Sequence, residues 1–187
     1  MQFKSVEELE SLVKNLDDAE TRPIQVIPSE TSVTSTVYNA TSYTAIWNTT
    51  KDQLESVVER RNSNLIQHKE AFVPFIRAVK QKGWEIEGEM HNLGGLVIVE
   101  AIFKGMKTDV NGDSINLGVR LKNSYNLKKF PFFSGEAFGF REKCSNGMFL
   151  GTSMVCSFSA KHVKIADLEK HLLEFIERVE ENSKYLE

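Results

Sequence analysis

Two apolar stretches on either side of a glycine turn decide the fold: LVIVEAIF at residues 96–103, then INLGVRLK at residues 115–122, with Asn111-Gly112 between them. The first is apolar except for Glu100, as is typical of a central strand covered on both faces. In the second, apolar residues alternate with polar residues or glycine, and Asn-Gly is the favoured sequence of a two-residue type I′ turn. The pattern therefore predicts an antiparallel hairpin.

The segments that follow extend this sheet and cover it with a helix. Two more strands are predicted at about residues 136–143 and 149–158, joined by a turn at Cys144-Ser145-Asn146-Gly147. The last segment, residues 163–184, has apolar residues at helical spacing and predicts an amphipathic helix. Runs of strands flanked by helices, without strand–helix–strand alternation, indicate an α+β fold: an antiparallel β-meander with helices packed on one face.

The N-terminal half is predicted to begin with a helix at residues 5–17, because Ser5-Val6-Glu7-Glu8 forms a capping box. The region 21–83 reads as a strand near residues 42–47, followed by helical structure that starts at a second capping box, Thr50-Lys51-Asp52-Gln53. Pro74 should divide this stretch into two helices or kink one, and Gly83 should end it. With the sheet at 84–158, we expect one domain over residues 1–187.

Composition and charge limit the classes of function. A chain of 187 residues with 41% hydrophobic content can bury one substantial core, and its net charge of -3 argues against a protein that coats nucleic acid over its whole surface. The charge is uneven, because residues 102–164 hold ten Lys and Arg against four Asp and Glu. Charged residues at the N-terminus and the lack of a long apolar run predict a cytoplasmic protein without a membrane partner.

The sequence predicts neither a metal site nor an enzyme. Cys144 and Cys156 are too few for a four-thiolate zinc site, and we expect reduced thiols, with one disulfide open if the two lie on paired strands. The four histidines lack metal-ligand spacing. Residues 109–113 start like a calcium loop, but Ser114 and Arg120 replace its glycine and glutamate, so a hairpin turn explains them better. No phosphate loop, nucleophile elbow or zinc-helix motif occurs, so we expect no catalytic residue and no cofactor.

Cations and aromatic residues gather in and beside the predicted hairpin. If Leu121 and Phe140 face the core, alternation turns their neighbours Arg120, Lys122, Arg141 and Lys143 to the other side of the sheet. A single strand of nucleic acid needs cations for its phosphates and aromatic rings for its bases. We therefore predict single-stranded DNA binding or annealing, with RNA left open, through a basic, aromatic-lined sheet face made of Arg120, Lys122, Tyr125, Lys128, Lys129, Phe132, Phe133, Arg141 and Lys143.

Two alternatives stay open. In the first, Phe130-Pro131-Phe132-Phe133 forms an exposed apolar patch that docks a protein partner or another copy, which makes the chain a non-catalytic interaction or self-assembly module and allows a homo-oligomer. In the second, which is less favoured, the chain is an enzyme that acts on nucleic acid with Cys144 or Asp109 in its site.

Two motifs carry a family resemblance: Asn123-Ser124-Tyr125-Asn126, and later Cys144-Ser145-Asn146-Gly147-Met148. On these residues the chain resembles a phage- and plasmid-borne family of unknown function, over residues 30 to 158. It departs from that family at Asn126 and Leu127, where Asp and Gly are usual. The resemblance implies a mobile-element or archaeal setting and, as an analogy of fold alone, a likeness to single-strand annealing recombination proteins, which assemble into rings or filaments.

Overall fold

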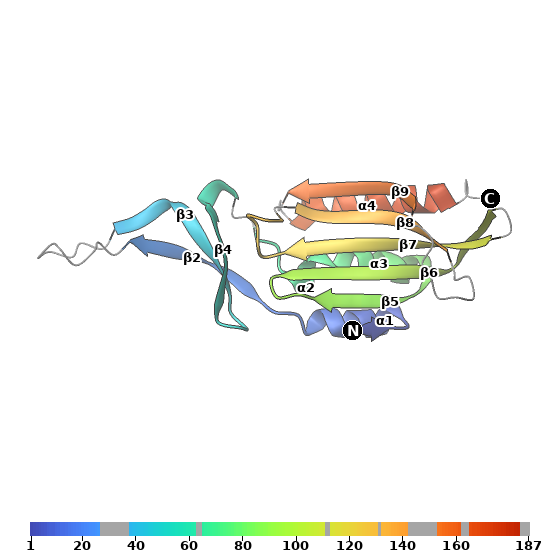
Figure 1. Ribbon diagram of the computed structural model, residues 1–187, viewed down its shortest axis with the longest axis horizontal. Helices are drawn as coiled ribbons and strands as arrows, with labels where there is room; N and C mark the ends of the chain where they lie inside the picture. The colour runs from blue at the N-terminus through green and yellow to red at the C-terminus, as the bar shows by residue number, and fades with distance from the viewer. Residues whose placement is uncertain are drawn as a thin grey trace, which may run out of the picture.

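The computed structural model describes residues 1–26, 38–62, 65–110, 113–130, 132–141, 153–161 and 165–183, which form two antiparallel sheets (Figure 1). The larger sheet has the strand order β1-β5-β6-β7-β8-β9. From β5 onward its neighbours in space are neighbours in sequence, so the predicted meander is confirmed. Its strands are β1 (Gln2–Phe3), β5 (Glu85–Asn92), β6 (Leu96–Val110), β7 (Asp113–Ser124), β8 (Phe132–Arg141) and β9 (Ser153–Lys161).

Helices cover one face of this sheet, as expected of the α+β class (Figure 1). They are α1 (Val6–Lys14), α2 (His68–Ala71), α3 (Val73–Lys82) and α4 (Ile165–Ser183). On β6 the odd-numbered residues from Val97 to Phe103 are buried against the helices, while even-numbered residues such as Glu100 point to the other side. Phe175 of α4 packs on Phe158 of β9, with ring centroids 4.8 Å apart. Alternation along the strands therefore sets which face carries the core.

The smaller sheet consists of β2 (Ala19–Val26), β3 (Tyr38–Asn48) and β4 (Gln53–Glu59), in that order. It projects from one end of the larger sheet (Figure 1). We call this sheet the arm, and the larger sheet with its helices the body. The arm turns Ile46 and Val58 toward the body, where they form a second small apolar cluster with Ala19, Tyr125 and Leu127. The arm is thus packed on the body by one of its two faces.

The helix predicted from the second capping box is wrong, because residues 53–59 form the strand β4. The Asn48 side chain folds the chain into a turn, since its Oδ1 accepts hydrogen bonds from the backbone N–H groups of Thr50 (3.1 Å) and Lys51 (2.9 Å). Asp52 takes a left-handed conformation, with φ 52°, that sends the chain back along β3. A 3-10 helix, η1 (Arg60–Asn62), follows β4.

Other local predictions are confirmed. Pro74 lies in the first turn of α3, so the stretch is divided into α2 and α3, and α3 ends at Gly83, which takes the left-handed conformation with φ 65°. β6 and β7 pair as the predicted hairpin, with Val110 opposite Asp113, although the turn residues 111–112 lie outside the described residues. Cys144 and its turn also lie outside them, so the disulfide stays an open alternative.

Candidate functional site

Arg120 and Lys122 lie on the face of the body sheet away from the helices, as predicted, but this face is not basic. Arg120 Nε lies 2.5 Å from Glu100 Oε1, and Glu136 carboxylate oxygens lie 3.5 Å from Arg120 Nη1 and 3.1 Å from Lys122 Nζ. On the neighbouring strands, Lys104 pairs with Glu87 in the same way, at 3.1 Å. The acids come from strands on both sides of β7, so the sheet register neutralises its cations.

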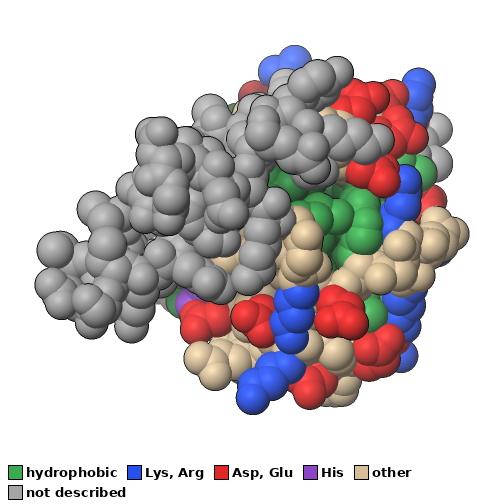
Figure 2. Space-filling model, turned by 90° about the vertical axis from the view of Figure 1, so that its right-hand side faces the viewer, with side chains coloured by type: hydrophobic (Ala, Val, Ile, Leu, Met, Phe, Trp, Pro, Cys, Tyr) green, Lys and Arg blue, Asp and Glu red, His purple; other side chains and the backbone are tan. Residues whose placement is uncertain are grey.

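The end of the body that faces away from the arm shows the same pattern. Among its described residues, acidic and basic side chains are interspersed, and no extended surface of one sign forms on the side drawn in Figure 2. Arg141, predicted to share the face of Arg120, pairs in register with Ile115, whereas Arg120 pairs with Glu136. The backbone position of Arg141 therefore lies on the opposite face of β8 from Glu136. The prediction of a basic sheet face is wrong for the described strands.

Two of the predicted stacking residues are fully buried. The Tyr125 and Phe133 side chains have no exposed surface. Phe133 packs in the body core between Phe72 and Phe158, with ring centroids at 6.0 and 5.8 Å. Rings enclosed in this way cannot stack on a base, so their predicted role is wrong. Phe132 begins β8, but its side chain is outside the described part of the chain, as are the side chain of Arg141 and the whole of Lys143.

Lys128 and Lys129 are exposed, as predicted, on the connection between β7 and β8. The Asn126 side chain holds this connection in a turn, because its Oδ1 accepts a hydrogen bond from the Lys129 backbone N–H at 3.1 Å. Lys129 Nζ lies 5.4 Å from the centre of the partly exposed Phe130 ring. Among the described residues, neither lysine forms an ion pair. This turn is the part of the predicted binding surface whose cations stay available.

The arm carries a surface that the sequence analysis did not single out. Tyr43, Trp47, Leu54 and Val57 lie on its outer face, because the register places Tyr43 opposite Glu59, Ala45 opposite Val57 and Trp47 opposite Leu54. Tyr43 is 49% exposed, Leu54 53% and Val57 41%. We call these four residues the arm face. Alternation at Tyr43, Ala45 and Trp47 was the signal that could have predicted it.

Charged residues border the arm face in pairs of opposite sign. On β2, Arg22 pairs with Glu20 at 2.5 Å, and its guanidinium carbon lies 4.5 Å from the centre of the Trp47 ring. On the other side of the arm, Arg61 pairs with Glu59 at 2.5 Å. The described residues of the arm, its β3–β4 turn and η1 hold four carboxylates and four cations in total. The arm face is therefore an apolar surface in electrically neutral surroundings.

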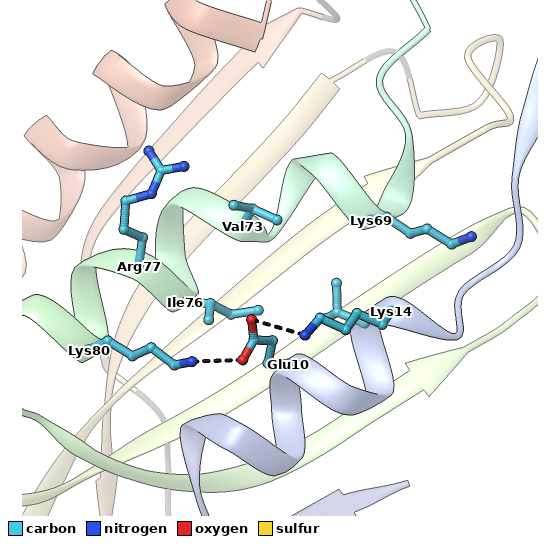
Figure 3. A pocket seen from close by; sticks show the side chains of 8 residues that line it. Glu10, Lys14, Lys69, Val73, Ile76, Arg77 and Lys80 are labelled. Carbon is cyan, nitrogen blue, oxygen red and sulfur yellow. Dashed lines mark hydrogen bonds and ion pairs between the residues drawn. The ribbon is translucent and has the colours of Figure 1, made fainter.

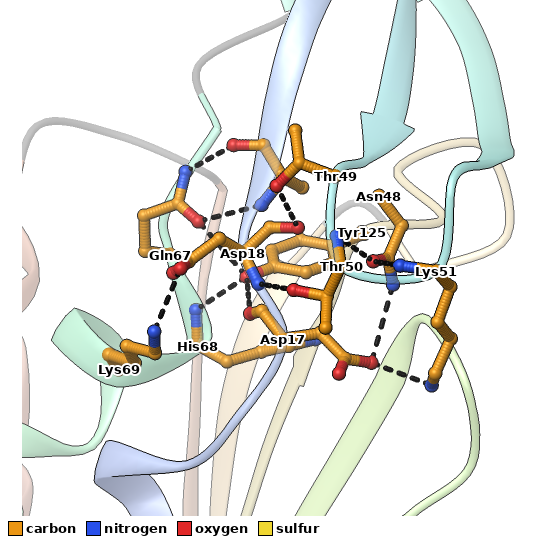
Figure 4. Close-up of polar contacts among 11 residues, drawn as sticks. Asp17, Asp18, Asn48, Thr49, Thr50, Lys51, Gln67, His68, Lys69 and Tyr125 are labelled. Atoms are coloured by element: carbon orange, nitrogen blue, oxygen red, sulfur yellow. Dashed lines mark hydrogen bonds and ion pairs between the residues drawn. The ribbon is translucent and has the colours of Figure 1, made fainter.

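Tyr125 connects the arm to the body through a buried polar cluster (Figure 4). Its hydroxyl donates a hydrogen bond to the Asp17 carbonyl (2.7 Å) and accepts one from the His68 backbone N–H (3.1 Å). The two rings of Tyr125 and His68 are stacked, 3.7 Å apart. The Tyr125 carbonyl accepts a hydrogen bond from the Ser56 hydroxyl on β4 (2.9 Å). Through its hydroxyl, Tyr125 thus joins the end of β7 to the α1–β2 connection and the start of α2, and through its backbone carbonyl it joins them to the arm.

Further side chains complete this cluster, which we call the junction: Asp17, Asn48, His68, Asn123 and Tyr125. Asn123 donates to the Ile66 carbonyl (3.2 Å), and its Nδ2 lies 2.9 Å from His68 Nδ1. Asn48 Nδ2 donates to Asp17 Oδ2 (3.3 Å), which also lies 2.6 Å from Lys51 Nζ. Polar groups that are buried and hydrogen-bonded fix one geometry.

Burial raises the pKa of Tyr125, so its hydroxyl keeps its proton at neutral pH and donates to Asp17. Burial also acts to raise the pKa of Asp17, but the Lys51 ammonium and the Asn48 amide lower it by more, so the carboxylate is held ionised. All five junction side chains are buried. The junction therefore suits a fixed connection between arm and body better than a site that must admit a substrate.

Within the described ranges, no three His, Cys, Asp or Glu side chains form a group that could hold a metal ion. No helix in the described part of the chain is long and apolar enough to cross a membrane.

Comparison of the chain with protein-family models, with curated proteins and with solved structures finds no match. The resemblance to a phage- and plasmid-borne family therefore stays a prediction. Its first motif, residues 123–126, lies in and beside the junction, and its second, residues 144–148, lies outside the described residues.

Proposed function

We propose that this chain is a non-catalytic self-assembly module, in which the arm face docks onto a second copy of the chain. The observation that carries the proposal is the exposure of Tyr43, Leu54 and Val57 beside Trp47 on one face of a sheet that is fixed to the body. Contiguous exposed apolar surface is typical of a docking site.

The charges around the arm face favour a second copy over nucleic acid as the partner. Each flank of the face carries one cation and one carboxylate, Arg22 with Glu20 and Arg61 with Glu59. In a two-fold contact the same patch meets itself, so a patch with both signs can pair with its own copy. A polyanion would instead require an excess of cations.

The free energies of burial and of association predict a weak contact between two copies. Burying eight partly exposed apolar side chains across two copies is worth on the order of 1–1.5 kcal/mol each, against a cost of about 4 kcal/mol or more for association. At the lower end of this cost the difference is roughly 4–8 kcal/mol, which corresponds to a dissociation constant between about 1 mM and 1 μM. Such a contact becomes effective when an assembly repeats it.

Sedimentation velocity over a wide range of protein concentration tests this proposal. We expect the mass to rise with concentration for the natural sequence and to stay monomeric for Val57→Glu. Leu173→Glu is the matched control, because Leu173 on α4 is 40% exposed against 41% for Val57 but lies on the body. A monomer at millimolar protein, or an equal response to both substitutions, would overturn the proposal.

Trp47 provides a second readout on the same surface. The chain has two tryptophans, and Trp84→Phe leaves Trp47 as the only one. Docking should remove water from its ring, so we expect its emission to shift to shorter wavelength as the concentration rises. An emission that does not change while the mass increases would place the contact elsewhere.

A second candidate is single-stranded nucleic-acid binding through Lys128, Lys129 and Phe130. The exposure of two lysines without ion pairs among the described residues, next to a partly exposed ring, favours it. Two phosphate contacts should give a shallow salt dependence, with a slope of about -0.7 for each contact. This candidate uses a smaller surface than the sheet face expected from the sequence.

Fluorescence anisotropy of labelled single-stranded and duplex oligonucleotides separates the two candidates. We expect weak, salt-sensitive binding that prefers single strands and is lost in Lys128→Gln/Lys129→Gln. The control, Lys4→Gln/Lys170→Gln, removes the same charge from two other exposed lysines. Absence of binding at low salt, or equal loss in both double variants, would exclude this candidate and leave self-assembly.

A further inference from the structure

A groove of about 360 Å³ lies on the body between α1 and α3 (Figure 3). Val13 of α1 and Ile76 of α3 form its floor, and both are buried. Val73, one turn before Ile76, is 40% exposed. The groove therefore offers an apolar surface, within the size range of pockets that bind small molecules.

Two lysines converge on the middle of this groove from opposite sides (Figure 3). Lys80 Nζ lies 2.7 Å from Glu10 Oε2, and Lys14 Nζ lies 3.3 Å from Glu10 Oε1. Lys69 and Arg77 also line the groove but pair with Asp18 and Glu169. The lining thus has four cations against one carboxylate of its own.

The Glu10 carboxylate shows which kind of chemical group the two lysines bind. Hydrogen bonds from Lys80 and then Lys14 lower the pKa of Glu10, so its carboxylate is ionised at neutral pH. The Glu10 side chain is also partly exposed, and ion pairs of this kind exchange readily with other anions. An anionic head group from solution can therefore take the place of the Glu10 carboxylate between Lys14 and Lys80.

We propose that the groove binds a small aliphatic carboxylate, with its chain on Val13, Val73 and Ile76 and its head group between Lys14 and Lys80. An aliphatic chain fits the floor, because the floor residues are all aliphatic. A cationic head group would meet like charge from the lysines. The site is on the body and does not involve the arm face, so it stands independently of the proposed self-assembly.

Methyl resonances of Val73 and Ile76 test the site directly. Decanoate, decyltrimethylammonium and decanol have nearly the same alkyl chain and differ in head group, and each is titrated below its aggregation limit at neutral pH. We expect decanoate to shift both methyl groups in a saturable way, decanol to do so at least about tenfold more weakly, and the ammonium compound not at all. Equal binding of all three, or shifts spread over the protein, would overturn the proposal.

Two sets of substitutions in the groove should change the affinity for decanoate in opposite directions. Glu10→Gln removes the competing carboxylate and should tighten decanoate binding roughly threefold or more, a gain that a purely structural role of Glu10 does not predict. Lys14→Gln/Lys80→Gln should weaken it about tenfold. Lys128→Gln/Lys129→Gln, with the same change in charge elsewhere, should leave it unchanged. Loss of binding in Glu10→Gln in a folded protein, or equal loss in both lysine variants, would contradict the proposal.

Discussion

The body and the arm are both antiparallel sheets with one covered face, but they differ in what the other face carries. On the body, the residues away from the helices include ion-paired rows such as Glu100, Arg120 and Glu136. On the arm, the corresponding residues are Tyr43, Trp47, Leu54 and Val57. The paired charges of the body face are already stable in water. Covering an apolar face with a partner, by contrast, lowers the free energy of the system. The difference assigns stability to the body and association to the arm.

Truncation of the body core should have the largest effect. Phe103 is buried against Phe75 and Trp84, with ring centroids at 6.4 and 5.0 Å. We expect Phe103→Ala to lower the free energy of unfolding by about 3–5 kcal/mol, measured by urea denaturation. Val57→Ala on the arm face should change it by only about 0.5 kcal/mol. Similar losses at both sites would remove the distinction between the two regions.

Loosening the junction should affect the arm more than the body. Tyr125→Phe removes the hydroxyl that bonds Asp17 and leaves the buried His68 N–H without its acceptor, at a cost of about 1–3 kcal/mol. We expect amide hydrogen exchange to accelerate in β2 and β4 while β6 stays protected.

Tyr43→Phe provides the control for this substitution, because Tyr43 is exposed on the arm face and loses the same atom. It should leave exchange unchanged. A uniform acceleration over both sheets in Tyr125→Phe would mean that the junction supports the whole fold rather than the position of the arm.

The parts of the fold that the sequence predicted depend on short-range patterns. The β6–β7 hairpin follows from Asn-Gly and from alternation within one segment, and Gly83 and Pro74 mark the ends of α3 locally. The sequence wrongly predicted a helix after Thr50, because the spacing of Leu54, Val57 and Val58 also fits a helix. Pairing of β4 with β3, which spacing within one segment cannot reveal, decided the outcome.

The candidate site was less predictable because its chemistry depends on partners distant in sequence. The sequence suggested that Arg120 is a free cation. The register of three strands places Glu100 and Glu136 beside it, and both form ion pairs with it. Tyr125 read as a stacking residue in a loop, but its hydroxyl reaches Asp17, 108 residues away. Lys128 and Lys129 were predicted correctly as exposed, since a turn rich in lysine needs no distant partner to stay in solvent.

Acid should weaken the junction before it weakens the body core. The pKa of Asp17 is lowered in the folded state, so its ionised form favours folding above its unfolded pKa of about 3.9. This contribution is lost as the pH falls through the lower folded value. We expect Asp17→Asn to cost on the order of 1 kcal/mol at neutral pH, with the difference from the natural sequence shrinking on acidification, measured by urea denaturation at several pH values. A difference that is constant with pH would contradict this reading.

Removing the acids of the open body face should also have only a small effect on stability. Glu100→Gln/Glu136→Gln deletes partners of partly exposed ion pairs, so the free energy of unfolding should change by less than about 1 kcal/mol. The same change removes these carboxylate partners of Arg120 and Lys122 on the open face, where the sequence suggested a basic surface. We therefore expect the double variant to gain salt-sensitive binding of single-stranded DNA, measured by fluorescence anisotropy beside the natural sequence. If the natural sequence already binds as strongly, the glutamates do not neutralise this face, and the body sheet must be considered again as a binding surface.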